Sequence, residues 1–537
     1  MQRKSENKRN ACEGSITLFL ALTLTIILSL IFSLLEAARV QALVRIARRD
    51  LQLRLESAFG RYHVPMWDNY HMLFLDGKDA KGQFNLSVLE GILMEEAALE
   101  QMERGFYQIS LKNIEIEKYA LATDQKGKFF REQACRAMKE KLAAQTADRI
   151  KGILKQGEVL EKDSHEAEEK WKQAQEAAEK AKEAAEAAKK EGEGKAAGKE
   201  VEAETAGKDG EAKTAEKDRE GEAAGKDGEA ETAKTAGEGE EKLPENPMDF
   251  VSLWKKSPIL TLVVENSLQI SQKSISQKNS IQNRKLETGN LEKTGKETLE
   301  KLWLIQYLNT YFSCQSGAGA GGGDSHALDY ELEYCIGGKE TDSQNLEQAV
   351  NRLLLLREAG NFATIMQDSG KQALAMEMAA AAVGFTGLPP LIQAVQVGIL
   401  LGWSYMESIL DVRHLLAGGK VPLIKEVSQW QSDVSLGQKA LEQDTKQEEQ
   451  GLDYREYLQI LLLSVKEDTL VYRAMDVMEQ NIRLLPGEET FAMDHMIQGV
   501  EADTVSGTDS MFLGLITSGR ERDGMYHFDS RYQIFYE

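Results

Sequence analysis

The apolar pattern of the chain is strongest near its N-terminal end. Residues 15–35 carry no charged side chain, and a helix of this length covers about 30 Å, the thickness of a bilayer core. From Glu36 to Phe59 apolar residues recur at helical spacing, without a Gly or Pro. The pattern predicts a transmembrane helix over 15–35 that continues as an amphipathic helix over 36–60.

The flanks of this segment favour a retained anchor over a cleaved signal peptide. A secretory apolar region has about 7–15 residues and ends at a neutral site of small residues. In this chain the charged residues Glu36 and Arg39 occupy the position of that cleavage site. Their i,i+3 spacing lets them form an ion pair on one helix face. Basic residues in 1–14 favour a cytoplasmic N-terminus, but further arginines follow the segment, so charge alone leaves the orientation open.

The rest of the chain predicts an α+β fold with long helices and an antiparallel sheet. Alternation of apolar and polar residues predicts strands at 109–119, with a bulge at Asn113, at 326–336 and at 525–536, with weaker candidates at 491–505 and 511–518. Helical spacing predicts helices over 129–154, 299–312, 345–383 and 453–484. The first strand has no partner nearby in sequence, so we expect it to pair with the second and third.

A low-complexity stretch of Ala, Glu, Lys and Gly interrupts this domain at residues 161–245. It contains Ala-Gly-Lys-Asp-Gly-Glu-Ala twice, at 206–212 and 224–230, and a repeat so short and polar predicts disorder. It is either a spacer or a neutral expansion in a tolerant loop. We therefore divide the chain into 1–14, a basic N-terminus; 15–35, the span; 36–60, its extension; 61–160 and 246–537, two parts of one α+β domain; and 161–245, the linker.

A second long uncharged stretch runs from Met378 to Met406. Its length suggests another membrane span, but Gly387-Leu-Pro-Pro390 breaks it into two pieces that are short for that role. We predict two buried helices of a water-soluble domain.

Composition excludes some functions and assigns none. The net charge of -22 argues against nucleic-acid binding. We find no catalytic motif, no cofactor-binding motif and no metal-ligand spacing, so the sequence does not predict an enzyme. Glu407 and Asp411 lie near one helix face with Arg413 and His414, which makes either a cation site or a structural ion-pair network.

The four cysteines include no C-x-x-C pair, which disfavours a zinc ribbon or a thioredoxin-like motif. Cys314 and Cys335 flank a glycine-rich loop. They form a disulfide if that part of the chain lies outside the cell, or else they are buried thiols.

The N-terminus resembles the TadE and TadG proteins, pseudopilin-like components of Tad (Flp) pilus systems. The resemblance rests on Gly14 before Ser-Ile-Thr-Leu-Phe, about twenty apolar residues, and Glu36-Ala-Ala-Arg39. It makes Gly14-Ser15 the counterpart of a prepilin-peptidase site. Prepilins carry Glu at the fifth position after the cut, where this chain has Phe19, so we expect no processing.

Four further stretches resemble an uncharacterised family of Gram-positive membrane proteins that accompany Tad-like pilus components. They begin at Tyr70, Tyr330, Trp403 and Arg473. The resemblance implies a structural or assembly component of such a pilus or secretion system, anchored by one pass and mainly extracytoplasmic. Its partners would be membrane lipid and other pilus components, with no nucleic acid and no cofactor.

Two alternatives stay open. The chain could be an anchored extracellular enzyme or ligand-binding module, which predicts a concave pocket with converging polar groups in the α+β domain. The arginines after the span also allow a protein that faces the cytoplasm.

Overall fold

The computed structural model describes residues 3–95, 106–141, 255–264, 270–292, 300–315, 326–432, 450–512 and 525–536, with a few positions between 152 and 180. The chain divides into two compact units. The first, here called the sheet unit, comprises residues 1–154, 270–349 and 458–537. The second, the helical unit, comprises 155–269 and 350–457.

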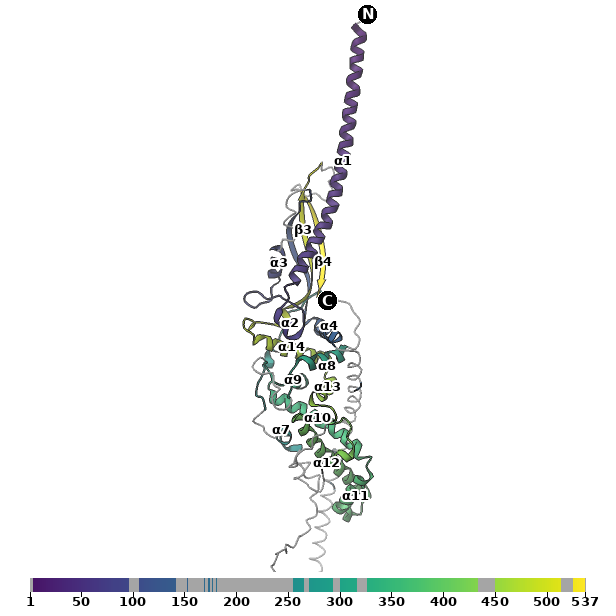
Figure 1. Cartoon of the computed structure of the whole chain (residues 1–537), viewed down its shortest axis with the longest axis vertical. Helices are drawn as coiled ribbons and strands as arrows, with labels where there is room; N and C mark the ends of the chain where they lie inside the picture. The colour runs from purple at the N-terminus through teal and green to yellow at the C-terminus, as the bar shows by residue number, and fades with distance from the viewer. Residues whose placement is uncertain are drawn as a thin grey trace, which may run out of the picture. The chain divides into compact units, whose positions relative to one another are not determined.

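A single helix, α1 (Arg3–Phe59), begins the sheet unit. Its first half extends away from the strands and its second half lies along them (Figure 1). The first half exposes its apolar side chains, whereas Leu43, Leu51 and Leu55 in the second half are fully buried. The predicted continuous helix, with an apolar part followed by an amphipathic part, is therefore confirmed.

The sheet has four antiparallel strands, and β3 (Met496–Asp509) pairs with each of the other three. The others are β1 (Leu75–Asp76), β2 (Ser110–Leu121) and β4 (Met525–Phe535). The register of β2 shifts between Leu111 and Asn113, where the sequence predicts a bulge. The sheet joins two strands that precede the low-complexity stretch, β1 and β2, to two that follow it, β3 and β4, which confirms the α+β class.

The predicted strand at 326–336 is wrong. Residues Glu331–Gly337 form the helix α9, and β2 pairs with β3 instead. An alternating pattern indicates a strand when one face is solvated, but every side chain from Glu331 to Ile336 is buried. The carboxylates of Glu331 and Glu333 accept hydrogen bonds from the backbone N–H groups of Ser313 and Gln315. These bonds let both carboxylates be buried, so the polar positions of the pattern do not form a solvated face.

The core of the sheet unit lies between α1 and the sheet. Leu51 and Leu55 of α1 pack in one apolar cluster with Ile114 of β2 and Val500 of β3. The short helix α3 (Leu86–Glu95) closes this cluster with Leu89 and Leu93. Besides α9, the unit contains α2 (Val64–Tyr70), α4 (Asp124–Lys141), α8 (Glu300–Tyr311) and α14 (Glu467–Arg483).

The helical unit contains α7 (Ile259–Val263), α11 (Ser369–Val383) and α12 (Pro389–Leu416), together with most of α10 (Asp342–Ile365) and the start of α13 (Tyr454–Ser464). Two predicted long helices are each divided. A break at 366–368 separates α10 from α11, where Asp368 caps α11 by accepting from the N–H of Lys371 (2.7 Å). A shorter break separates α13 from α14.

The uncharged stretch 378–406 forms the end of α11 and most of α12, so the predicted pair of helices is present. The predicted burial is correct for α12 from Gly398 to Val412, but the end of α11 and the start of α12 are mostly exposed or half-buried. Among the described residues one helix is long and apolar enough to cross a membrane, and it is α1. The linker 161–245, apart from a few positions, lies outside the described residues, as does most of the weak strand candidate 511–518. The backbone of Gly14 and Ser15 belongs to α1, but their side chains are not described.

Candidate functional site

The first half of α1 is the largest apolar surface of the sheet unit. The most apolar window of the helix has none of its residues buried. Its exposed large side chains include Ile16, Leu18, Phe19, Leu20, Leu22, Leu24, Ile26, Ile27 and Leu30. Soluble domains rarely expose a continuous apolar surface of this extent, and a helix of this length and composition could be a single membrane span or a signal sequence.

The exposed half of α1 ends at a buried ion pair. Arg39 Nη1 lies 3.1 Å from Glu36 Oε1, and these side chains are 2% and 0% exposed. Arg39 also donates to the carbonyl oxygen of Phe106 (2.7 Å), the carbonyl oxygen of Asp509 (3.1 Å) and the hydroxyl of Thr508 (2.8 Å). The ion pair expected from the i,i+3 spacing is thus present, and it reaches the end of β3 and the segment before β2.

Glu36 completes this connection from the other side. Its carboxylate accepts hydrogen bonds from the backbone N–H groups of Met511 (3.2 Å) and Phe512 (3.3 Å). The two charges therefore satisfy one another and five groups of the sheet and its adjoining segments. Since buried charges are tolerated only when they are paired in this way, the pair fixes α1 against the sheet at the point where the apolar half begins.

The sheet unit also contains a cavity of about 520 Å³ with an aromatic wall. Trp67 and His71 lie one turn apart at the end of α2 and stack with centroids 5.3 Å apart. His71 takes a left-handed backbone conformation as the C-cap of α2, and its ring lies 5.6 Å from that of Tyr311. Lys141 Nζ lies 4.9 Å from the Tyr311 ring centroid, the geometry of a cation–π contact.

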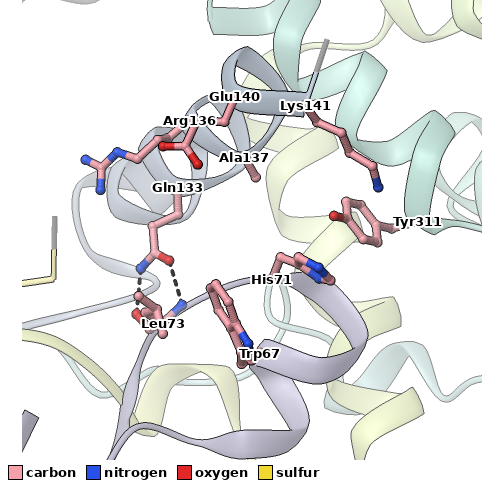
Figure 2. Close-up of a pocket in the computed structure, with 9 residues that line it drawn as sticks. All are labelled: Trp67, His71, Leu73, Gln133, Arg136, Ala137, Glu140, Lys141 and Tyr311. Carbon is pink, nitrogen blue, oxygen red and sulfur yellow. Dashed lines mark hydrogen bonds between the residues drawn. The ribbon is translucent and has the colours of Figure 1, made fainter. Parts of the chain in front are cut away.

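Helix α4 supplies the polar wall of this cavity (Figure 2). Arg136, Glu140 and Lys141 line it from successive turns. Gln133 holds α4 to the chain after α2, because its amide both accepts from the N–H of Leu73 (2.7 Å) and donates to the carbonyl of Leu73 (2.6 Å). A cavity of this size with converging polar groups has the properties of a small-molecule site.

A smaller cavity of about 160 Å³ shares Tyr311 and is lined by His326, whose ring pairs with a buried carboxylate. His326 Nδ1 lies 2.7 Å from Glu331 Oε1, and that hydrogen bond raises the pKa of His326 above its usual value. Asn481 donates to the hydroxyl of Tyr70 (2.9 Å), and burial raises the pKa of Tyr70 well above its ordinary range. A carboxylate that orients an imidazole can support proton transfer, and here Glu331 itself is buried.

Another cluster of potential ligands already contains a cation. The side chains of His63, Asp76 and Glu488 could together hold a metal ion. Lys78 Nζ lies 3.1 Å from Asp76 and 2.7 Å from Glu488, so its ammonium group forms ion pairs with both carboxylates. The cluster is explained by this ion-pair network without a metal.

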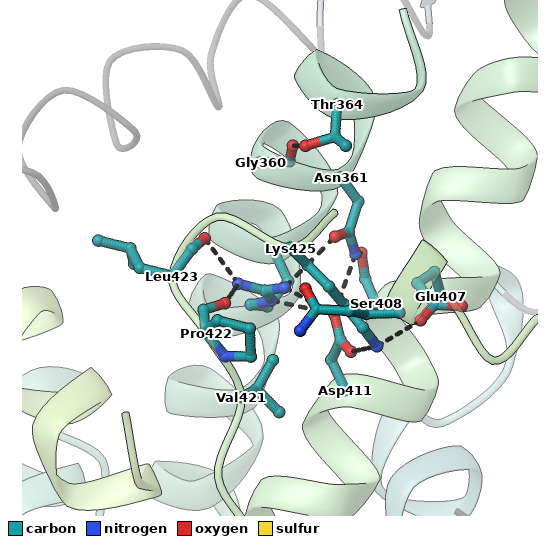
Figure 3. A network of polar contacts seen from close by, with 12 residues as sticks. Gly360, Asn361, Thr364, Glu407, Ser408, Asp411, Val421, Pro422, Leu423 and Lys425 are labelled. Carbon is teal, nitrogen blue, oxygen red and sulfur yellow. Dashed lines mark hydrogen bonds and ion pairs between the residues drawn. The ribbon is translucent and has the colours of Figure 1, made fainter. Parts of the chain in front are cut away.

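Glu407 and Asp411 of the helical unit form an ion-pair network, but not with the partners that their position suggests. Lys425 Nζ lies 2.6 Å from Glu407 and 3.0 Å from Asp411, and Arg357 Nη2 lies 2.8 Å from Asp411 (Figure 3). Burial would raise the pKa of Asp411, but the two cations outweigh it and lower that pKa. Arg413 instead donates to the carbonyl of Leu262 (2.6 Å).

The possible disulfide is absent. Cys314 and Cys335 are both buried thiols. Cys335 lies in α9, and burial raises the pKa of its thiol, which holds it in the unreactive protonated form. Of the two possibilities left open by the sequence, the structure has the buried thiols.

The cavity residues were not identified by the sequence. They come from α2, α4, α8 and the segments near 326 and 481, and no spacing along the chain indicates that they meet. The one local signal is Trp67 and His71 at i,i+4, which predicts contact on a helix face.

Replacing Arg39 tests the buried junction. Arg39→Met leaves the Glu36 carboxylate buried without its cation, so the free energy of unfolding should fall by about 3–5 kcal/mol. Arg45→Met changes an exposed arginine of the same helix and should leave it unchanged. Urea unfolding of the full chain in detergent micelles measures both, and equal small effects would show that the pair does not hold α1 to the sheet.

Replacing His326 tests the histidine–carboxylate pair through pH. Its folded-state pKa is raised, so the protonated imidazole stabilises the fold fully below about pH 6.5, and this stabilisation is lost as pH rises through the folded-state pKa. His326→Gln should therefore destabilise the protein more at about pH 5.5 than at about pH 9, by roughly 1 kcal/mol after solvent screening. Thermal unfolding at both pH values measures this, with His71→Asn as the control; a pH-independent effect contradicts the pairing.

Residues 237–508 match the family of unknown function DUF5702. No curated protein and no solved structure matches the chain. The matched region covers half of the sequence, and the family carries no assigned activity. The chain belongs to the family of unknown function DUF5702.

Proposed function

We propose that this protein is a membrane-anchored, mainly extracytoplasmic structural component of a Tad-like pilus or secretion system. The observation that carries the proposal is the divided use of α1. One uninterrupted helix exposes an apolar half long enough to span a bilayer and buries its other half against an antiparallel sheet. The TadE- and TadG-like pattern of the same helix supports this assignment.

The mechanism of such a component is assembly. The apolar half of α1 is held first by lipid and then by the apolar helices of neighbouring subunits, which bury the same surface. Glu36 and Arg39 join this half to the sheet, so the sheet unit follows any movement of the helix. The basic residues of the N-terminus favour its cytoplasmic side, with the folded units outside.

Crosslinking from α1 tests the assembly role. A photoreactive amino acid at Leu24, in the exposed apolar half, should form covalent adducts with apolar N-terminal helices of pilus subunits in cells that express the system. The same group at Glu56 lies about 48 Å further along α1 and should not give these adducts. Mass spectrometry of the adducts identifies the partner; a Leu24 probe that captures only lipid would refute the assembly role while leaving the anchor intact.

The aromatic cavity supports a second candidate function, an anchored ligand-binding module. Its volume of about 520 Å³ fits a small molecule, and the Trp67, His71 and Tyr311 rings offer stacking surfaces beside the cations of α4. The chemistry suits a ligand with a planar or ring-shaped part and a negative group.

Native mass spectrometry of the full chain, released gently from its own membrane, tests this second function. The protein should carry a bound small molecule, and the pair of substitutions Trp67→Ala and Tyr311→Ala should remove it. Phe385→Ala removes an exposed aromatic residue of the helical unit and should retain the ligand. An unsubstituted chain without any bound mass would count against the cavity as a ligand site.

A further inference from the structure

Apolar side chains from two segments gather around α1 where its exposed half ends. Phe512, just after β3, stacks on Phe32 of α1 with centroids 5.8 Å apart and planes 10° apart. Phe106, just before β2, lies 5.8 Å from Phe512 and 5.0 Å from Tyr107. We call Phe106, Tyr107, Met511 and Phe512 the collar.

Three of the four collar side chains are exposed although they are apolar, and Phe512 is half-buried. Phe106 is 40% exposed, Tyr107 43% and Met511 51%, and Phe32 beside them is 36% exposed. The sheet unit has a well-packed apolar core only a few residues away. The exposure of the collar is therefore not explained by the lack of a core in which to bury it. The exposed collar adjoins the longer exposed apolar surface of α1, so we expect the same apolar surroundings to cover both.

The position of the collar matches the end of the membrane span. Phe32 lies three residues, or about 4.5 Å along the helix axis, before Leu35, the last residue of the charge-free stretch. The collar therefore lies beside α1 at the depth where the helix leaves the hydrocarbon. Aromatic side chains are enriched at that boundary, because their rings are apolar and a tyrosine hydroxyl can still contact the headgroups.

The backbone of the collar is already hydrogen-bonded in a way that suits lipid. Arg39 binds the carbonyl oxygen of Phe106, and Glu36 binds the N–H groups of Met511 and Phe512. Without these partners the three groups would oppose contact with lipid, since an unsatisfied backbone group costs several kcal/mol in hydrocarbon. The ion pair thus satisfies backbone polar groups in both irregular segments, which leaves their apolar side chains to form the surface.

We propose that the collar inserts into the headgroup–acyl boundary of the bilayer and seats the sheet unit directly on the membrane. The inference rests on the proposed anchoring by α1 and adds a second lipid contact that fixes the depth of the helix. If a neighbouring subunit covered the collar, the collar would include polar side chains that pair with that subunit, as the rim of a protein interface does. The exposed collar side chains are instead aromatic or apolar, which suits lipid.

Depth-dependent quenching in bilayers tests the collar. The full chain is placed in phosphatidylcholine nanodiscs with a fluorescent label on one introduced cysteine. Each label is measured with two spin-labelled lipids, one that quenches near the headgroups, for the collar, and one that quenches near the bilayer centre, for the anchor. Three positions are compared: Leu24→Cys for the anchor, Tyr107→Cys for the collar, and Glu56→Cys, about 30 Å beyond Leu35 on the same helix, as the control. A parent chain without an introduced cysteine measures labelling of the native thiols.

The expected result is at least a twofold loss of fluorescence at Tyr107→Cys and Leu24→Cys, and none at Glu56→Cys. Quenching at Leu24→Cys with Tyr107→Cys as unquenched as the control would overturn the collar and leave the anchor standing. No quenching at Leu24→Cys would overturn the anchor, and the collar with it. Met511→Cys repeats the collar measurement at the other segment, and thermal unfolding shows that each labelled chain is folded.

Discussion

The sheet unit depends on the burial of one stripe of α1. Leu43, Leu51 and Leu55 recur on that stripe, and each is fully buried against the sheet and the elements that cover it. The same helix cannot bury its first half in this way, because the sheet ends beside residue 36 and the side chains before it face outward. The Glu36–Arg39 pair marks the change, and its hydrogen bonds position the end of β3 and the segment before β2. The collar is therefore a consequence of the same constraint.

Much of this arrangement can be predicted from the sequence, because the elements concerned have one apolar and one polar face. The second half of α1 shows a helical period, and β2 and β4 show alternation that the structure reproduces. The central strand β3 is harder to recognise. It is buried along almost its whole length, including Gln498 and Thr504, so polar residues occur at buried positions and obscure the alternation. The sequence therefore predicts this strand only weakly, as the candidate at 491–505, although it is the one that pairs with all the others.

The buried polar groups show the same limit at the level of the sites. Glu407 and Asp411 can be identified as a charged pair on one helix face, but their cations are Lys425, on a later segment, and Arg357, on another helix. Arg357 also donates to the carbonyl oxygens of Pro422 and Leu423, so the network fixes the segment after α12 against α10 (Figure 3). Local spacing predicted Arg413 or His414 because it detects neighbours along a helix and not those brought together by folding. The aromatic cavity was missed for the same reason.

A continuous helix distinguishes this protein from a domain tethered to a membrane by a flexible linker. There is no Gly or Pro between residues 15 and 59, so no hinge is available between the apolar half of α1 and the half that the sheet buries. A force applied to the apolar half, by lipid or by a neighbouring helix, acts directly on the Glu36–Arg39 pair and through it on β3. Because β3 is hydrogen-bonded to all three other strands, the load is distributed over the whole sheet. That coupling is what the proposed assembly role requires, because a subunit whose helix is moved during assembly must keep its fold.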